Sequence, residues 1–67
     1  MFRDIYDFLK DINDDKVFAA TYGRYGAGFS RTLSDEDTML IRDQLISRGY
    51  NTIIFTEVED HSFVSAY

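Results

Sequence analysis

Residues 34–67 read SDEDTMLIRDQLISRGYNTIIFTEVEDHSFVSAY, and their pattern of apolar residues changes from helical to extended. Ser34 is suited to an N-cap, and the acids at positions 35–37 complement the positive end of a helix dipole. Gly49 is a typical C-terminal stop. We therefore predict a helix that follows Ser34 and runs to Arg48.

Two strands are predicted after this helix. Residues 50–58 and residues 63–67 are rich in Thr, Ile, Phe and Val, the residue types that strands favour, and polar residues 59–62 separate them. Along residues 50–58 both alternating sets contain apolar side chains. We therefore expect the exposed sheet face to stay partly apolar, and the last strand to form an edge suited to pairing with a second copy.

The N-terminal half predicts a helix and a hairpin. Residues 2–13 place their apolar side chains on one half of a helical wheel, which is typical of an amphipathic helix. Residues 17–22 and 29–33 resemble strands, with a glycine-rich tip between them. The expected fold is a single α+β domain over residues 1–67 with the order αββαββ, an antiparallel sheet and both helices on one face.

Composition limits the classes of protein that this chain can belong to. It has 67 residues, 7 basic against 12 acidic side chains, a net charge of −5 and no cysteine. A domain of this size buries only about 60% of the surface of its unfolded chain, which excludes large enzymes with deep substrate chambers. The absence of cysteine excludes disulfides and thiolate metal sites, so packing of 11 aromatic side chains (6 Phe and 5 Tyr) must supply the stability.

The chain contains no apolar run near the roughly 20 residues that cross a bilayer. Residues 1–7 include the acidic side chains of Asp4 and Asp7, where a signal peptide would be apolar. We therefore expect a cytoplasmic protein without a membrane partner.

Residues 22–31 read YGRYGAGFSR and combine three glycines with three aromatic and two arginine side chains. A phosphate-binding glycine loop needs a helix directly after it, whereas a strand is predicted here. Residues 24–29 resemble the aromatic–glycine strand motif of RNA-recognition folds, with shifted spacing and no companion motif. A nucleic-acid-binding hairpin is therefore the alternative function. Its contacting residues are Lys16, Arg24, Tyr25, Phe29 and Arg31.

Few residues are suited to catalysis or to metal binding. Glu57, Glu59 and His61 would share one face of an extended chain, but two carboxylates and one imidazole form a weak ligand set, and a solvated turn is the simpler interpretation. His61 is also the only imidazole base for a serine nucleophile, and no Gly-x-Ser-x-Gly motif is present. We expect neither enzyme activity nor a cofactor or metal.

The helix over residues 34–48 has one anomaly. A helical wheel places Met39, Ile41, Leu45 and Ile46 on one side of the helix. Leu40 is the one apolar residue among the polar residues of the other side. An apolar side chain within a polar ring has the composition of an interface, and a partner would offer a pocket bordered by Lys or Arg. The predicted protein interface consists of Leu40, Glu36, Asp37, Asp43, Phe63 and Tyr67.

The sequence therefore favours a small acidic, non-enzymatic protein-binding module, either a small homodimer or a regulator or inhibitor of a host protein. A phage or mobile element is the expected source of such an accessory protein. The partner is expected to be a protein, with nucleic acid as the alternative.

Overall fold

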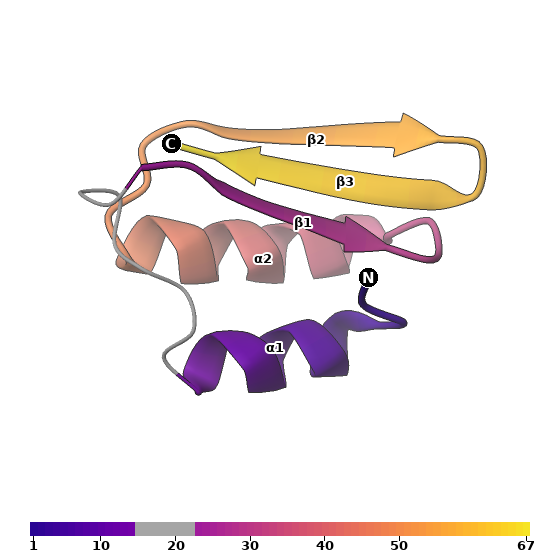
Figure 1. Cartoon of the computed structure of the whole chain (residues 1–67), viewed down its shortest axis with the longest axis horizontal. Coiled ribbons are helices and arrows are strands. Elements are labelled where there is room, and N and C mark those ends of the chain that lie inside the picture. The colour runs from indigo at the N-terminus through magenta and orange to yellow at the C-terminus, as the bar shows by residue number, and fades with distance from the viewer. Residues whose placement is uncertain (15–22) are drawn as a thin grey trace.

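The computed structural model describes residues 1–14 and 23–67, and its elements lie in two layers (Figure 1). The strand order is β1-β3-β2, and both neighbouring pairs are antiparallel. The last strand is therefore central, with a neighbour on each side, and the expectation that it forms an edge open to a second copy is wrong. Both helices lie against one face of this sheet (Figure 1). The predicted α+β class and antiparallel sheet are thus confirmed. The elements are α1 (Ile5–Asn13), β1 (Tyr25–Phe29), α2 (Asp35–Ser47), β2 (Ile53–Val58) and β3 (His61–Ala66).

The described residues do not match the predicted order αββαββ, because they form helix, strand, helix and two strands. The glycine-rich segment is not the tip of a hairpin but the strand β1 itself, and residues 30–34 lead into α2 instead of forming a strand. Pairing with β3 imposes the extended conformation despite two glycines, since tertiary context overrides weak strand propensity. The strand predicted at residues 17–22 lies outside the described residues.

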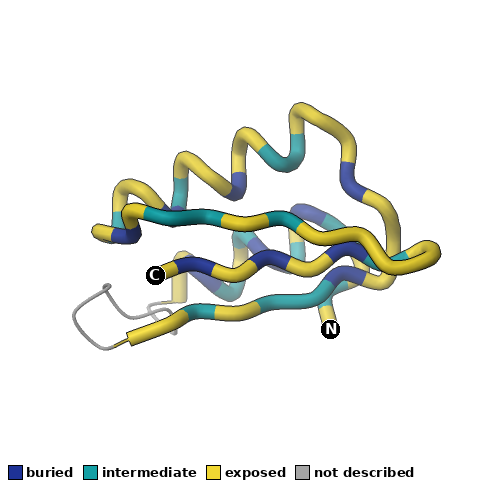
Figure 2. Tube along the Cα trace, turned by 90° about the horizontal axis from the view of Figure 1, so that it is seen from above, coloured by how far each residue is buried: buried dark blue, intermediate teal, exposed yellow. Residues whose placement is uncertain are grey.

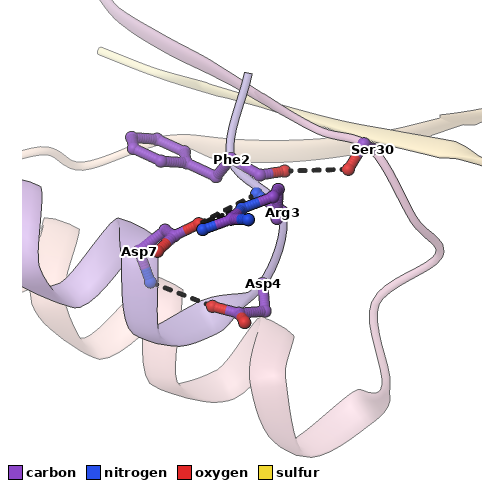
Figure 3. A network of polar contacts seen from close by, with 5 residues as sticks. All are labelled: Phe2, Arg3, Asp4, Asp7 and Ser30. Atoms are coloured by element: carbon purple, nitrogen blue, oxygen red, sulfur yellow. Dashed lines mark hydrogen bonds and ion pairs between the residues drawn. The ribbon is translucent and has the colours of Figure 1, made fainter.

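The N-terminal helix begins three residues later than predicted. Asp4 is the N-cap of α1, and its carboxylate accepts a 3.0 Å hydrogen bond from the Asp7 N–H (Figure 3). Phe2 pairs with β1: its N–H donates to the Gly28 carbonyl, and its carbonyl accepts from the Ser30 N–H, both at 2.8 Å. The N-terminal segment therefore covers one end of the β1 edge.

The start and stop signals of α2 are confirmed, and its body ends one residue earlier than predicted. The Ser34 side chain accepts from the Asp37 N–H at the start. At the end, Gly49 adopts a φ of 99°, its N–H donates to the Ile46 carbonyl and the Tyr50 N–H donates to the Leu45 carbonyl. This pair of bonds is the Schellman motif, which needs a left-handed residue that glycine supplies without strain.

The core lies between the helices and the sheet. On β3, buried residues alternate with exposed ones (Figure 2), so one face packs inward and the other is open. Arg48 joins the two helices, because its guanidinium donates to the Gln44 side chain and to the Ile12 carbonyl at the end of α1. The buried apolar residues are Ile5, Phe8, Ile12, Phe29, Leu33, Ile41, Leu45, Tyr50, Val64 and Ala66.

Candidate functional site

Two surfaces of the described residues expose several large apolar side chains, and the first lies on α2. Met39, Leu40 and Ile46 are 64%, 45% and 53% exposed. Glu36 and Asp43 lie among them, and together with Met39 and Leu40 they line a shallow depression. We name these five residues the α2 stripe.

The helical spacing explains why α2 has two apolar faces. Ile41 and Leu45 are fully buried and face the core. Met39, Asp43 and Ile46 follow the spacing i, i+4, i+7 and therefore share a different face, which is exposed. Leu40 is thus not a lone apolar residue, and Met39 and Ile46 do not lie on the buried side as predicted. The spacing of seven residues between Met39 and Ile46 was the signal in the sequence that could have identified this second apolar face.

Among the described residues, neither Glu36 nor Asp43 of the α2 stripe forms an ion pair. Within residues 1–14 and 23–67 the one ion pair joins Arg3 to Asp7 on α1, at 3.4 Å. Arg42, the arginine closest in sequence to the stripe, instead lies over the Phe55 ring, 5.9 Å from its centroid. The carboxylates of Glu36 and Asp43 therefore leave the stripe negatively charged.

Asp37, which was predicted with this group, lies at the side of the stripe. It is half-buried in the first turn of α2, and its N–H is held by Ser34. Asp37 therefore belongs to the start of the helix and not to the exposed stripe.

The second surface is the sheet face that points away from the helices. The strand registers place alternate residues on it, and four large apolar side chains there are between 37% and 54% exposed. Phe63 and Tyr67, both predicted for a protein interface, belong to this set. We name the surface the outer sheet face. Its side chains are those of Ile54, Thr56, Val58, His61, Phe63, Ser65 and Tyr67.

The outer sheet face is flat over β1 because Gly26 and Gly28 point no side chain outward. Gly28 lies opposite Phe63 in the register, and a Cβ at Gly28 would lie 3.2 Å from Phe63 Cε1 and 3.4 Å from the Met1 methyl group. The Phe63 ring and the Met1 side chain therefore cover the space that a larger residue would fill. Gly28 therefore serves close packing on this face instead of a turn.

No Asp or Glu points from the strands onto the outer sheet face in the described part of the chain. Arg24 lies at one end of the sheet, with its guanidinium 5.0 Å from the centroid of the Tyr67 ring. At the opposite end the β2–β3 turn carries Glu59 and Asp60. A neutral apolar centre thus has a positive end and a negative end.

The structure does not bring the predicted nucleic-acid residues together. Phe29 is fully buried in the core, and Tyr25 is half-buried between the rings of Phe8 and Tyr50. Burial raises the pKa of Tyr25 to about 12, which is consistent with an inward position. Arg31 is exposed beyond the end of β1, and Lys16 lies outside the described residues. Only Arg24 reaches the outer sheet face.

The residues considered for metal binding are separated by the sheet geometry. Glu57 lies opposite Ser62, which faces the core, whereas His61 lies opposite Val58 on the outer side. Glu57 and His61 therefore point from opposite faces. Across the described ranges, no three His, Cys, Asp or Glu side chains lie close enough to hold a metal ion.

Neither described helix has the length and apolar character that crossing a membrane requires. Comparisons of the chain with protein-family models, with curated proteins and with solved structures found no match. A functional assignment therefore depends on the α2 stripe and the outer sheet face themselves.

Proposed function

We propose that this chain is a small, non-enzymatic protein-binding module that docks through the α2 stripe. The observation that carries the proposal is the exposure of Met39, Leu40 and Ile46 between two carboxylates that lack ion pairs among the described residues. In this proposal the partner offers an apolar ridge flanked by Lys or Arg, and binding regulates or inhibits that partner.

Both the apolar side chains and the carboxylates of the α2 stripe favour such a partner. Fully burying one such apolar side chain contributes about 1.5–3 kcal/mol, and three neighbouring ones form the centre of a small interface. Unpaired carboxylates at the rim accelerate the approach of a basic partner and disfavour an acidic one. A second copy of this chain is acidic at the same positions, which makes it a poor occupant of the stripe. An amphipathic basic helix suits the stripe, because its apolar residues recur at i, i+3, i+4 and i+7.

The proposal is tested by selecting helical peptides from a randomised display library against the protein. Leu40→Asp serves as the discriminating variant, because Leu40 is exposed and the change places a third acid in the stripe. We expect selected peptides to carry apolar residues at helical spacing with Lys or Arg beside them. Loss of the Leu40 contact should weaken their binding about 10- to 100-fold, as fluorescence anisotropy would measure.

The matched control is Tyr6→Asp, which replaces an exposed apolar side chain, 75% accessible, on the other helix. It should leave peptide affinity unchanged, and circular dichroism should show both variants folded. If the enriched peptides bind Leu40→Asp and the unmodified chain equally, or if no peptide distinguishes the two, the α2 stripe is not the docking surface.

A further inference from the structure

The outer sheet face shares no residue with the α2 stripe and lies on the other side of the sheet. Ile54, Val58 and Phe63 are 46%, 54% and 37% exposed on it, and both helices of the described residues lie against the opposite face. A layer of sheet with one bare apolar face is completed by a second layer about 10 Å away. We infer that this second layer is the same face of another copy of the chain, giving a face-to-face homodimer.

The distribution of charge favours a second copy. The chain carries a net charge of −5, so two copies repel each other over most orientations. The strands of the outer sheet face contribute no carboxylate, so contact there desolvates no acidic side chain. The α2 stripe would bring Glu36 and Asp43 of both copies together, which excludes it from this contact.

The two ends of the sheet also fix the orientation of the copies. The guanidinium of Arg24 lies over Tyr67, at the end of the central strand β3, and the turn with Glu59 and Asp60 lies at the other end of β3. A two-fold axis in the plane of contact and perpendicular to the strands reverses one copy end for end. Each Arg24 then meets the acidic turn of its partner, so the patch is self-complementary, as an isologous dimer requires.

The size of the face predicts a weak, reversible dimer. Strands of five or six residues give a face about 20 Å long and about 15 Å wide, or roughly 300 Å², against about 800 Å² per partner in a standard interface. We therefore expect a dissociation constant of about 0.1 mM. The aliphatic Ile54 and Val58 suit another sheet better than nucleic-acid bases, which stack on aromatic rings.

Sedimentation equilibrium between about 10 µM and about 2 mM tests this inference. The average mass of the unmodified chain should rise from 7.8 kDa toward twice that value. Ile54→Lys should weaken association at least about 10-fold, because it buries an unpaired ammonium. It also changes the net charge to −4 (−5 + 1), which lowers general repulsion, so weaker association must come from the face itself. Val58→Lys is the second variant, should the first one unfold.

Charge reversal tests the orientation of the copies. Arg24→Glu alone, or Glu59→Lys with Asp60→Lys, should weaken association about 3- to 10-fold, and the three changes together should restore it. Met39→Lys, on the α2 stripe, should weaken peptide binding without weakening dimerisation. The proposal for the α2 stripe and the inference for the outer sheet face can therefore fail separately.

A chain that stays monomeric at about 2 mM, or an Ile54→Lys variant that associates as well as the unmodified chain, would overturn the inference. So would specific binding of a labelled single-stranded oligonucleotide at low salt that is lost with Phe63→Ala, because nucleic acid would then be the occupant of this face.

Discussion

The α2 stripe and the outer sheet face expose similar amounts of apolar side chain, and they differ mainly in the charges around it. The stripe places Met39, Leu40 and Ile46 between carboxylates without ion pairs in the described chain. The sheet face has a neutral centre, with Arg24 at one end and an acidic turn at the other. Exposed apolar area alone indicates that something binds, whereas the surrounding charge selects what binds.

This difference assigns the two surfaces to different partners. A surface whose charged side chains are two carboxylates repels its own copy and accepts a basic chain. A surface with one positive and one negative end is complementary to itself after a two-fold rotation. Both proposals therefore arise from the same net charge of −5, distributed unequally over a small domain.

The outer sheet face can be a docking surface only if folding does not require it in the way that it requires the core, and two phenylalanines test this. Phe29 is fully buried, whereas Phe63 is 37% exposed on the opposite face of the sheet. Phe29→Ala should lower the free energy of unfolding by about 3–5 kcal/mol, which leaves little of the stability expected for 67 residues. Phe63→Ala should cost about 1 kcal/mol, chiefly its packing over Gly28, and urea unfolding measures both.

Phe29→Leu provides a milder control if Phe29→Ala does not fold, because it keeps most of the buried volume and should cost less than about 1.5 kcal/mol. Equal losses for Phe63→Ala and Phe29→Ala would make Phe63 a core residue. The outer sheet face would then be part of the folding unit and not a docking surface.

The sequence predicted the parts of the fold that depend on local interactions. Ser34 and Gly49 bracket α2 as expected, because an N-cap hydroxyl and a left-handed glycine act within one helical turn. It did not predict β1, because the extended form of residues 25–29 depends on pairing with β3, almost forty residues later. Glycines at positions 26 and 28 suggested a loop, and the position of Gly28 beneath Phe63 is visible only after that pairing.

The exposed apolar residues of the candidate surfaces were predicted only in part, because their exposure also depends on tertiary structure. Leu40 was identified because it interrupts a polar face, but Met39 and Ile46 had been assigned to the buried side. A helical wheel orders residues by angle and does not show where the sheet lies relative to the helix. Whether Met39 and Ile46 are buried or exposed depends on where the sheet lies, and this is known only from the tertiary structure.

Removing the two acids of the α2 stripe tests whether their charge selects the partner. Glu36→Gln with Asp43→Asn keeps the apolar side chains and removes the rim charge. Peptides selected for Lys or Arg should lose about 10-fold in affinity, and the dependence of their affinity on salt concentration should become shallow. Titration by anisotropy at several salt concentrations measures both effects.

The control for this variant is Asp14→Asn with Glu57→Gln, which has the same net charge of −3 (−5 + 2) but changes exposed acids outside both surfaces. It should retain most of the peptide affinity. If both pairs of substitutions weaken binding equally, the general charge of the protein and not the rim of the stripe attracts the peptide. The stripe and the sheet face would then no longer differ in the way proposed.

Substitutions in the β2–β3 turn should change stability and dimerisation separately, and by small amounts. Glu59 has a φ of 56°, in the left-handed region where glycine is unstrained, so Glu59→Gly should raise the free energy of unfolding by about 0.5–1 kcal/mol. The same change removes a carboxylate proposed to face Arg24 of the other copy, and dimerisation should weaken about 2- to 3-fold. Asp60→Asn removes one charge without changing the strained position, and should weaken dimerisation with no gain in stability. A Glu59→Gly variant that is both more stable and more strongly dimeric would contradict the proposed orientation, because the turn would then act on association through its conformation and not through its charge.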